Sequence, residues 1–216
     1  MLIEKTLLGD INKEEIAINR IIEFQNKDGK ENIVAFSGGK DSIVLKHLVQ
    51  RSKIKAKNIY SPPSVDPPEL IQYIKEYHDD VIRMPYARDK KGNIITMWTL
   101  IPRKLIPPSR LVRYCCDFLK ERTGKEGDTV YLGVRWAESS KRSKLGMVGF
   151  WKRKTVVRPI IDWTDEEIWE YIRKYNLPYC KLYDQGFKRL GCMYWCITYS
   201  YFEKYLKIYN RRVMFI

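Results

Sequence analysis

Histidine and long apolar runs are scarce in this sequence of 216 residues, and both shortages exclude classes of protein. The histidines are His47 and His78 alone, so a histidine-based metal centre or catalytic triad is not expected. No stretch approaches the roughly 18 consecutive apolar residues of a membrane span. The first ten residues lack the basic start and apolar stretch of a secretory signal peptide. We therefore expect a cytoplasmic protein that makes no membrane contact.

Cysteine is sparse as well, with five residues: Cys115, Cys116, Cys180, Cys192 and Cys196. In a reducing compartment, thiols or metal ligands are favoured over structural disulfides, and the odd number agrees with this. At 44% hydrophobic residues, the chain can bury the core of one α/β domain without a disulfide. One domain over 1–216 is predicted, with helical segments at 1–30 and 197–216.

Acidic residues are outnumbered, 26 against 40 Lys and Arg, and the formal charge of +14 favours polyanionic partners. Much of the excess lies in residues 135–158, called the basic stretch below, which holds eight basic residues and the single acid Glu138. We expect this stretch to contact a nucleic acid or an acidic protein, with Trp136, Phe150 and Trp151 available to stack on bases. A solvated basic loop is the alternative.

Apolar runs that indicate strands alternate with helical patterns along the chain. Strands are predicted at 32–36, 57–60, 81–84 and 129–134, and helices at 12–26, 41–51, 69–77, 110–122 and from Thr164 onward, where a capping box begins. The stretches 61–68 and 141–154 are expected to be loops. This alternation predicts an α/β fold with a single doubly wound parallel sheet and helices on both faces.

The most informative motif is Ser37-Gly38-Gly39-Lys40-Asp41-Ser42, called the phosphate loop (37–42) below. A strand that enters such a loop and leaves it as a helix presents backbone N–H groups and a helix N-terminus to one point, where an anion fits. The Ser37 and Ser42 hydroxyls can donate to phosphate oxygens, and Lys40, expected to project into solvent, adds a mobile charge. The motif is not a Walker A loop, because Asp41 follows the lysine.

This loop resembles the PP-loop of N-type ATP pyrophosphatases, which is shared with the phosphoadenosine phosphosulfate (PAPS) reductase-like family. Five further stretches resemble members of that family and follow in the same order: Val65 to Leu70, Arg113 to Cys116, Gly133 to Ser139, Pro159 to Trp163, and Leu182 to Cys192. The resemblance covers nearly the whole chain from Asn32 to Cys196. It implies an adenine nucleotide alpha hydrolase fold of the HUP type and an adenine nucleotide, ATP or PAPS, as ligand.

The resemblance also implies a set of site residues. Lys40, Arg135 and Arg142 are candidate catalytic residues, since a guanidinium offers two parallel donors to a phosphate or sulfate group. Asp66, Glu138 and Asp162 are candidates to orient these arginines or a Mg²⁺ ion. The candidate nucleotide-binding residues are Ser37, Gly38, Gly39, Lys40, Asp41, Ser42, Asp66, Gly133, Arg135 and Glu138.

Relatives with a Cys-Cys pair and a later Cys-x-x-Cys are expected to carry a 4Fe-4S cluster. Here Cys115, Cys116, Cys192 and Cys196 are the candidate ligands, although the last two are four positions apart instead of three. Such a pair still shares one face of a helix, and Cys180 is a spare thiol. Zinc is the alternative metal, and two unliganded core thiols are the alternative for Cys115 and Cys116.

Two reactions fit this set of residues. In the first, an acceptor attacks the α-phosphate of ATP and pyrophosphate leaves, in a sulfur-transfer or nucleic-acid-modification reaction; Lys40 favours it by stabilising the leaving group. In the second, a cysteine thiolate reduces PAPS or its unphosphorylated analogue, but the Glu-Cys-Gly-Leu-His segment of the reductases is not found in this sequence. A non-catalytic nucleotide-binding subunit is the third hypothesis.

Overall fold

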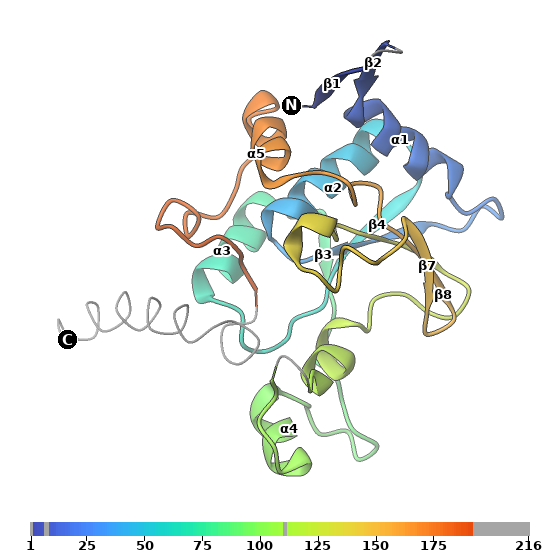
Figure 1. The fold of residues 1–216 in the computed structure, drawn as a ribbon. Coiled ribbons are helices and arrows are strands. Elements are labelled where there is room, and N and C mark those ends of the chain that lie inside the picture. Colours follow the sequence, from blue (N-terminus) through green and yellow to red (C-terminus); the bar gives the residue numbers. More distant parts are fainter. Residues whose placement is uncertain (1, 7–8, 110–111, 192–216) are drawn as a thin grey trace.

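A six-stranded, mostly parallel sheet flanked by helices forms the centre of the computed structural model, which describes residues 2–6, 9–109 and 112–191 (Figure 1). Its spatial order is β5 (Val81–Arg83), β4 (Ala56–Tyr60), β3 (Asn32–Phe36), β6 (Thr129–Leu132), β8 (Lys154–Val157) and β7 (Val148–Trp151). Within this sheet β7 alone is antiparallel to its neighbour. The predicted doubly wound α/β fold is confirmed.

The chain enters the sheet at its centre and changes direction there. From β3 it proceeds outward through β4 to β5, and it then returns to the other side of β3 as β6. The gap above the carboxyl ends of β3 and β6 is therefore the topological switch point, where open α/β sheets bind ligands. The phosphate loop follows β3 directly and lies at this point.

The helices pack on the sheet through two apolar clusters. Val34 of β3 is fully buried with Ile21 of α1 (Lys13–Glu23), Leu45 of α2 (Lys40–Ser52) and Tyr171 of α5 (Asp165–Lys174). A second cluster joins the strand ends to Leu70 and other residues of α3 (Pro68–Tyr77). These two clusters hold the carboxyl edge of the sheet in place. No helix among the described residues is long and apolar enough to cross a membrane.

The N-terminal segment is only partly helical, contrary to the expectation for 1–30. A hairpin of β1 (Ile3–Thr6) and β2 (Gly9–Asn12) precedes α1. The predicted start of the helix is confirmed, because the Asn12 side chain accepts hydrogen bonds from the N–H groups of Glu14 and Glu15. The predicted segment at 197–216 lies outside the described residues.

Residues 141–154 are not only a loop, because β7 and β8 form a hairpin there. Its turn places Lys152 and Arg153 at φ 49° and 59°. Two successive residues with positive φ suit a tight hairpin, yet the sequence lacks the Asn-Gly or Asp-Gly pair that usually announces one. The prediction of a loop was wrong for this reason.

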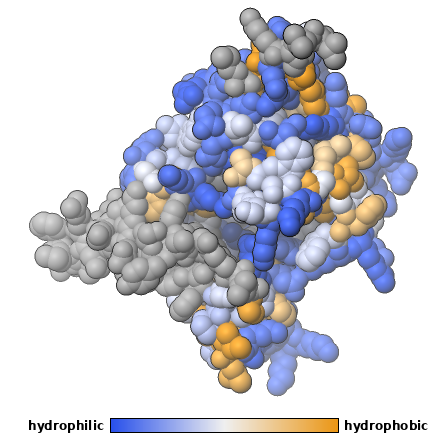
Figure 2. Space-filling view, in the orientation of Figure 1, coloured by the Kyte–Doolittle hydropathy of each residue, from blue (hydrophilic) through white to orange (hydrophobic). Residues whose placement is uncertain are grey.

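The connection between β5 and β6 also differs from expectation. It contains α4 (Met97–Lys104), which was not predicted because Pro102 lies inside it. Over 112–122, the described part of the helix predicted at 110–122, the structure has the short π-helix η1 (Cys116–Lys120) in place of a full helix. Ser61 donates a hydrogen bond of 2.6 Å to the Leu119 carbonyl, so a tertiary contact takes a group that a regular helix would use. Apolar side chains gather on the surface at the α4 end, where Leu105 is 88% exposed (Figure 2).

Candidate functional site

Two glycines bring the phosphate loop against its neighbours. Gly38 has a φ of 72°, and a Cβ there would lie 2.7 Å from Cδ1 of Leu70. A Cβ on Gly133, just after β6, would lie 2.9 Å from the Asp41 carbonyl oxygen. Only glycine fits either position, and the loops that follow β3 and β6 meet at the switch point as a result.

The two serines of the phosphate loop have different surroundings. The Ser42 hydroxyl is buried, donates to the Gly39 carbonyl at 2.8 Å and accepts from the Ser37 N–H at 3.2 Å. Ser37 is exposed, and its hydroxyl contacts Ser42 Oγ at 3.3 Å. Ser42 therefore shapes the loop, whereas the exposed Ser37 hydroxyl is accessible to a ligand.

Lys40 does not project into solvent, and that prediction was wrong. The residue is 2% exposed and is the first of α2. Its Nζ lies 3.4 Å from Asp165 Oδ1 and 3.7 Å from Asp41 Oδ2, and it donates to the Lys188 carbonyl at 3.3 Å. Its backbone N–H donates to the Tyr183 hydroxyl at 2.8 Å. The charge of Lys40 is thus fixed at the helix N-terminus by carboxylates from two elements.

Arg135 reaches the same two carboxylates from the loop after β6. It is 1% exposed; its Nε donates to Asp41 at 2.6 Å, one terminal nitrogen donates to Asp165 at 2.5 Å, and the other donates to the Trp163 carbonyl at 3.0 Å. Lys40, Asp41, Arg135 and Asp165 form a cluster of alternating charges, called the charge cluster below. It joins the loop after β6 to α2 and α5.

The charge cluster determines the ionisation of its carboxyl groups. Burial favours the neutral form of Asp165, but the hydrogen bond from Arg135 and the charge of Lys40 outweigh it and hold the pKa below its usual range. Burial raises the pKa of Asp41 against the opposing effects of Lys40 and Arg135. Asp165 is therefore the firmly ionised partner of Lys40 at neutral pH.

The remaining acidic candidates divide into two groups. Glu138 accepts from the Arg135 N–H at 3.0 Å and forms ion pairs with Arg142 and Arg189, so it connects Arg142 to the charge cluster. Asp162 instead pairs with Arg20 through both carboxylate oxygens at 2.9 Å, and the expectation that it orients Arg135 or Arg142 was wrong.

Asp66 lies elsewhere on the carboxyl edge, after β4. The Tyr60 hydroxyl donates to its Oδ2 at 2.6 Å, while its Oδ1 is buried without a hydrogen-bond partner among the described residues. It contacts neither candidate arginine in the contacts described. Asp66 therefore lies outside the charge cluster, two residues before the start of α3, and its Oδ1 can accept a further hydrogen bond.

Sequence reasoning missed Asp165, Tyr183 and Lys188. Thr164 and Glu167 do form the predicted capping box at the start of α5, and Asp165 was expected only to be part of that motif. Tyr183 belongs to one of the stretches that carry the family resemblance, which was the available signal. Lys188 contributes its backbone carbonyl, so its side chain could not have indicated this role.

The cysteines are only partly within the described residues. Cys115 is 3% exposed against Val65 and Met97, Cys116 begins η1 and is half-buried, and Cys180 lies in the core, where burial raises the pKa of its thiol. Cys192 and Cys196 lie outside the described residues. Gly191 lies beside Lys120 of η1, since a Cβ there would be 3.2 Å from its Nζ. In the described part of the chain, no three Cys, His, Asp or Glu side chains are grouped as metal ligands.

A doubly wound sheet with a glycine-rich loop and a helix N-terminus at its switch point defines an open α/β domain whose ligand site is expected at the carboxyl ends of the strands. The chain belongs to the phosphoadenosine phosphosulfate reductase domain family, whose sequence model matches residues 31–197.

Similar curated proteins include enzymes of several kinds. An uncharacterized protein of Methanocaldococcus jannaschii is 28% identical over 84% of this chain and 39% of its own length. A probable FAD synthase of Caenorhabditis elegans is 30% identical over 84% of this chain and 33% of its own length. An adenosine 5'-phosphosulfate reductase of Shouchella clausii is 28% identical over 77% of this chain and 71% of its own length. The chain thus spans well under half of the first two proteins.

Solved structures show the same fold. The PAPS reductase of Candida auris, solved as a phosphate complex, has a TM-score of 0.58 at 14% identity and covers 89% of this chain and 93% of its own. The FMN adenylyltransferase of Candida glabrata, in complex with FAD and inorganic pyrophosphate, has a TM-score of 0.56 at 19% identity and covers 83% of this chain and 60% of its own. At these identities the likeness concerns the fold alone.

Proposed function

We propose that this chain binds ATP with its phosphates on the phosphate loop and catalyses attack by an acceptor on the α-phosphate. The bond between the α-phosphorus and the bridging oxygen breaks, and pyrophosphate leaves with the electron pair. A second nucleophile, the sulfur donor in a sulfur-transfer reaction, then attacks the adenylylated acceptor, and AMP leaves. The reaction class would be sulfur transfer or nucleic-acid modification.

The observation that carries this proposal is the buried Lys40 at the first turn of α2. Its ammonium is held by Asp165 and Asp41 beside the backbone N–H groups of the loop, so it needs no reorganisation when negative charge develops on a leaving pyrophosphate. Preorganised charges of this kind are usually the largest contribution to catalysis. The fold likeness to an adenylyltransferase solved with pyrophosphate is compatible with this role.

Other candidates receive supporting roles in this proposal. Arg135 holds Asp41 and Asp165, and Gly133 allows its loop to approach α2. Arg142, 28% exposed at its side chain and paired with Glu138, is the candidate for a second contact with the phosphates. Mg²⁺ commonly binds one or two carboxylates together with substrate phosphates, and Asp41 is the carboxylate within the loop itself.

We also propose a 4Fe-4S cluster, because the resemblance to relatives with a Cys-Cys pair and a later Cys-x-x-Cys implies one. Cys115 and Cys116 would supply two thiolates, and Cys192 and Cys196 the others. The contact of Gly191 with the Lys120 side chain supports this, because Gly191 directly precedes Cys192 and Lys120 belongs to the short helix that Cys116 begins. When bound, such a cluster would supply redox or sulfur chemistry next to the carboxyl edge.

Sulfonucleotide reduction is the second candidate, supported by the similarity to the Shouchella clausii reductase over most of both chains. It requires an accessible thiolate. Of the cysteines described, Cys115 and Cys180 are buried and Cys116 is half-buried, so none of them is a favourable nucleophile. A nucleotide-binding subunit without turnover is the third candidate.

Two parallel assays separate the three candidates. Wild-type protein is given ATP, Mg²⁺ and candidate acceptors, and AMP and pyrophosphate are measured; a second sample receives PAPS and a thiol reductant, and sulfite is measured. We expect pyrophosphate and no sulfite. Sulfite without pyrophosphate contradicts the proposal in favour of reduction, and tight ATP binding without any product favours the subunit.

Lys40→Ala is expected to lower ATP affinity or pyrophosphate release about tenfold or more, the scale of one lost charge-stabilising contact. Lys55→Ala is the matched control, because Lys55 is an exposed lysine just before β4, at the opposite end of the sheet. Thermal unfolding of both variants shows whether the fold is retained. Unchanged binding and turnover in a folded Lys40→Ala protein would remove the basis of the proposal.

A further inference from the structure

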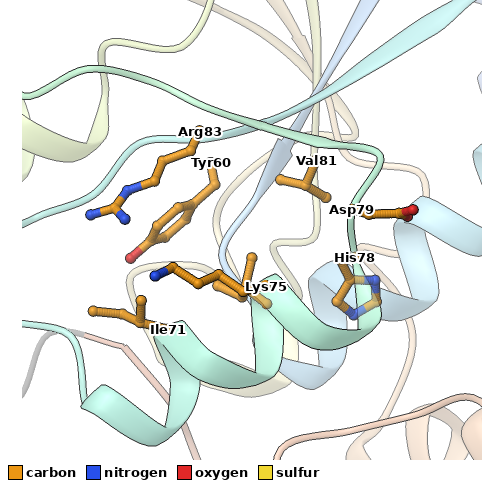
Figure 3. Close-up of a pocket in the computed structure, with 8 residues that line it drawn as sticks. Tyr60, Ile71, Lys75, His78, Asp79, Val81 and Arg83 are labelled. Atoms are coloured by element: carbon orange, nitrogen blue, oxygen red, sulfur yellow. The ribbon is translucent and has the colours of Figure 1, made fainter.

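An opening lies beside the phosphate loop, between α3 and the ends of β4 and β5. It is a pocket of about 230 Å³ (Figure 3). Tyr60 and Arg83 are the last residues of their strands, so the pocket opens at the same carboxyl edge as the phosphate loop. Its volume is smaller than the roughly 300–1,000 Å³ of sites that enclose a whole ligand. It fits one group of a larger molecule.

Two cationic side chains, and the Tyr60 hydroxyl that donates to Asp66, lie at one end of this pocket. Figure 3 shows the Arg83 guanidinium, the Tyr60 hydroxyl and the Lys75 ammonium extending toward the same side, whereas Asp79 and His78 lie at the other end. Within the described part of the chain, neither Lys75 nor Arg83 forms an ion pair; Arg83 donates to the Tyr86 hydroxyl at 3.1 Å and stacks on its ring. Two unneutralised cations on one side of a small pocket favour an anion.

Ile74 separates this pocket from the nucleotide phosphates. Its side chain lines the pocket and also contacts the phosphate loop, since a Cβ on Gly38 would lie 2.8 Å from Ile74 Cδ1. The nucleotide already has the N-terminus of α2 and Lys40 for its phosphates. The pocket is therefore separated from the phosphate loop by the Ile74 side chain, and its positive charges come from Lys75 and Arg83 instead of from Lys40.

We infer that this pocket is a subsite for a phosphate or sulfate group carried by the acceptor, bound by Lys75 and Arg83 with Tyr60 as its inner wall. A guanidinium and an ammonium together match a tetrahedral oxyanion, because the first offers parallel donors and the second a point charge. The assignment rests on the proposed function only in naming the acceptor as the owner of that group; binding of the oxyanion is independent of it.

The test is a titration with inorganic phosphate, followed by isothermal calorimetry and ³¹P line broadening, on protein saturated with a non-hydrolysable ATP analogue. Chloride at equal ionic strength controls for screening. The double variant Lys75→Met/Arg83→Met is expected to bind phosphate at least tenfold more weakly than wild type, and Lys55→Met to bind it as wild type does. Affinity for the ATP analogue is expected to be the same in all three proteins.

Equal phosphate affinity in the double variant overturns the inference. So does the absence of phosphate binding to wild-type protein saturated with the analogue, which would make the pocket part of the nucleotide site. If the analogue does not bind wild-type protein, the proposed function fails. The phosphate titration of the nucleotide-free protein and its variants then still decides the subsite.

Discussion

Among individual residues, Gly38 shows most directly how the phosphate loop depends on a missing side chain. Gly38→Ala is expected to destabilise the protein for two reasons. Its φ of 72° is left-handed, which costs an L residue about 1–2 kcal/mol, and its Cβ would press on Leu70 and Ile74. Gly29 is the matched control, with a φ of 71° and nothing within 4 Å of its Cβ position.

Chemical denaturation of the two variants separates the contributions. Gly29→Ala should lose the conformational part alone, and Gly38→Ala should lose about 1 kcal/mol or more beyond it, as expected for overpacking. Equal losses would mean that α3 moves aside freely and that the loop is not held by it.

The role of Lys40 illustrates what the sequence can and cannot predict for a single residue. The Ser-Gly-Gly-Lys-Asp-Ser motif correctly predicted a turn from a strand into a helix, because backbone geometry there is local. Burial of the lysine depends on Asp165 and on the Tyr183 and Lys188 segment, which are distant in sequence. No local pattern specifies such a meeting.

Where α2, α3 and the start of β5 meet, His78 forms a pH-sensitive junction. Tyr73 donates its hydroxyl proton to the Pro178 carbonyl, so the Nε2–H of His78 donates to Tyr73 and its Nδ1 accepts from Lys46. Burial, then the charge of Lys46, lower the pKa of His78 to about 4, against the opposing effects of Asp80 and Asp79. The folded protein therefore holds His78 neutral.

The sign of the pH effect follows from this pKa. Between pH 6.5 and 4 the unfolded chain binds a proton at His78 that the folded chain does not, so the free energy of unfolding falls as pH decreases through this range. The stabilisation is complete above pH 6.5. His78→Gln should show a flatter dependence of stability between pH 7 and 4.5, measured by denaturation. An identical slope in wild type and variant would contradict the neutral imidazole.

Strands and helices could be predicted where the periodicity was unbroken. The strands β3 to β6 and the starts of α1 and α5 came out within a few residues, because alternation and capping residues are local signals. The hairpin of β7 and β8 could not, since its turn uses Lys152 and Arg153 in a conformation that those residues rarely adopt. The α4 helix was not predicted, because Pro102 lies inside it.

For the whole molecule, the charge of +14 is less available than the sequence indicates. In the basic stretch, Arg135, Arg142, Lys152 and Arg153 are ion-paired with carboxylates, and Lys154 donates to a buried carbonyl. Lys141, Lys144 and Arg158 are left as cations without an ion pair among the described contacts. Contact with a nucleic acid or an acidic protein stays a prediction, and the structure limits its strength.

That limit can be measured with duplex DNA. If the basic stretch binds through these three cations, the logarithm of affinity should fall against the logarithm of salt concentration with a slope of about −3 or shallower, near −0.9 per phosphate contact. Fluorescence anisotropy at several salt concentrations gives the slope. Lys141→Met/Lys144→Met should make it shallower by roughly two. A slope that does not change in this variant would exclude the stretch as the contact.

The charge cluster also bears on when the segments around the proposed nucleotide site lose their conformational freedom. Arg135 pairs with Asp41 and with Asp165, so two ion pairs within the protein connect the three segments that surround the proposed nucleotide site. Backbone ordering costs about 1–2 kcal/mol per residue, and here that entropy is lost during folding. For a nucleotide bound as proposed, the ordering of these segments would therefore not be subtracted from its affinity.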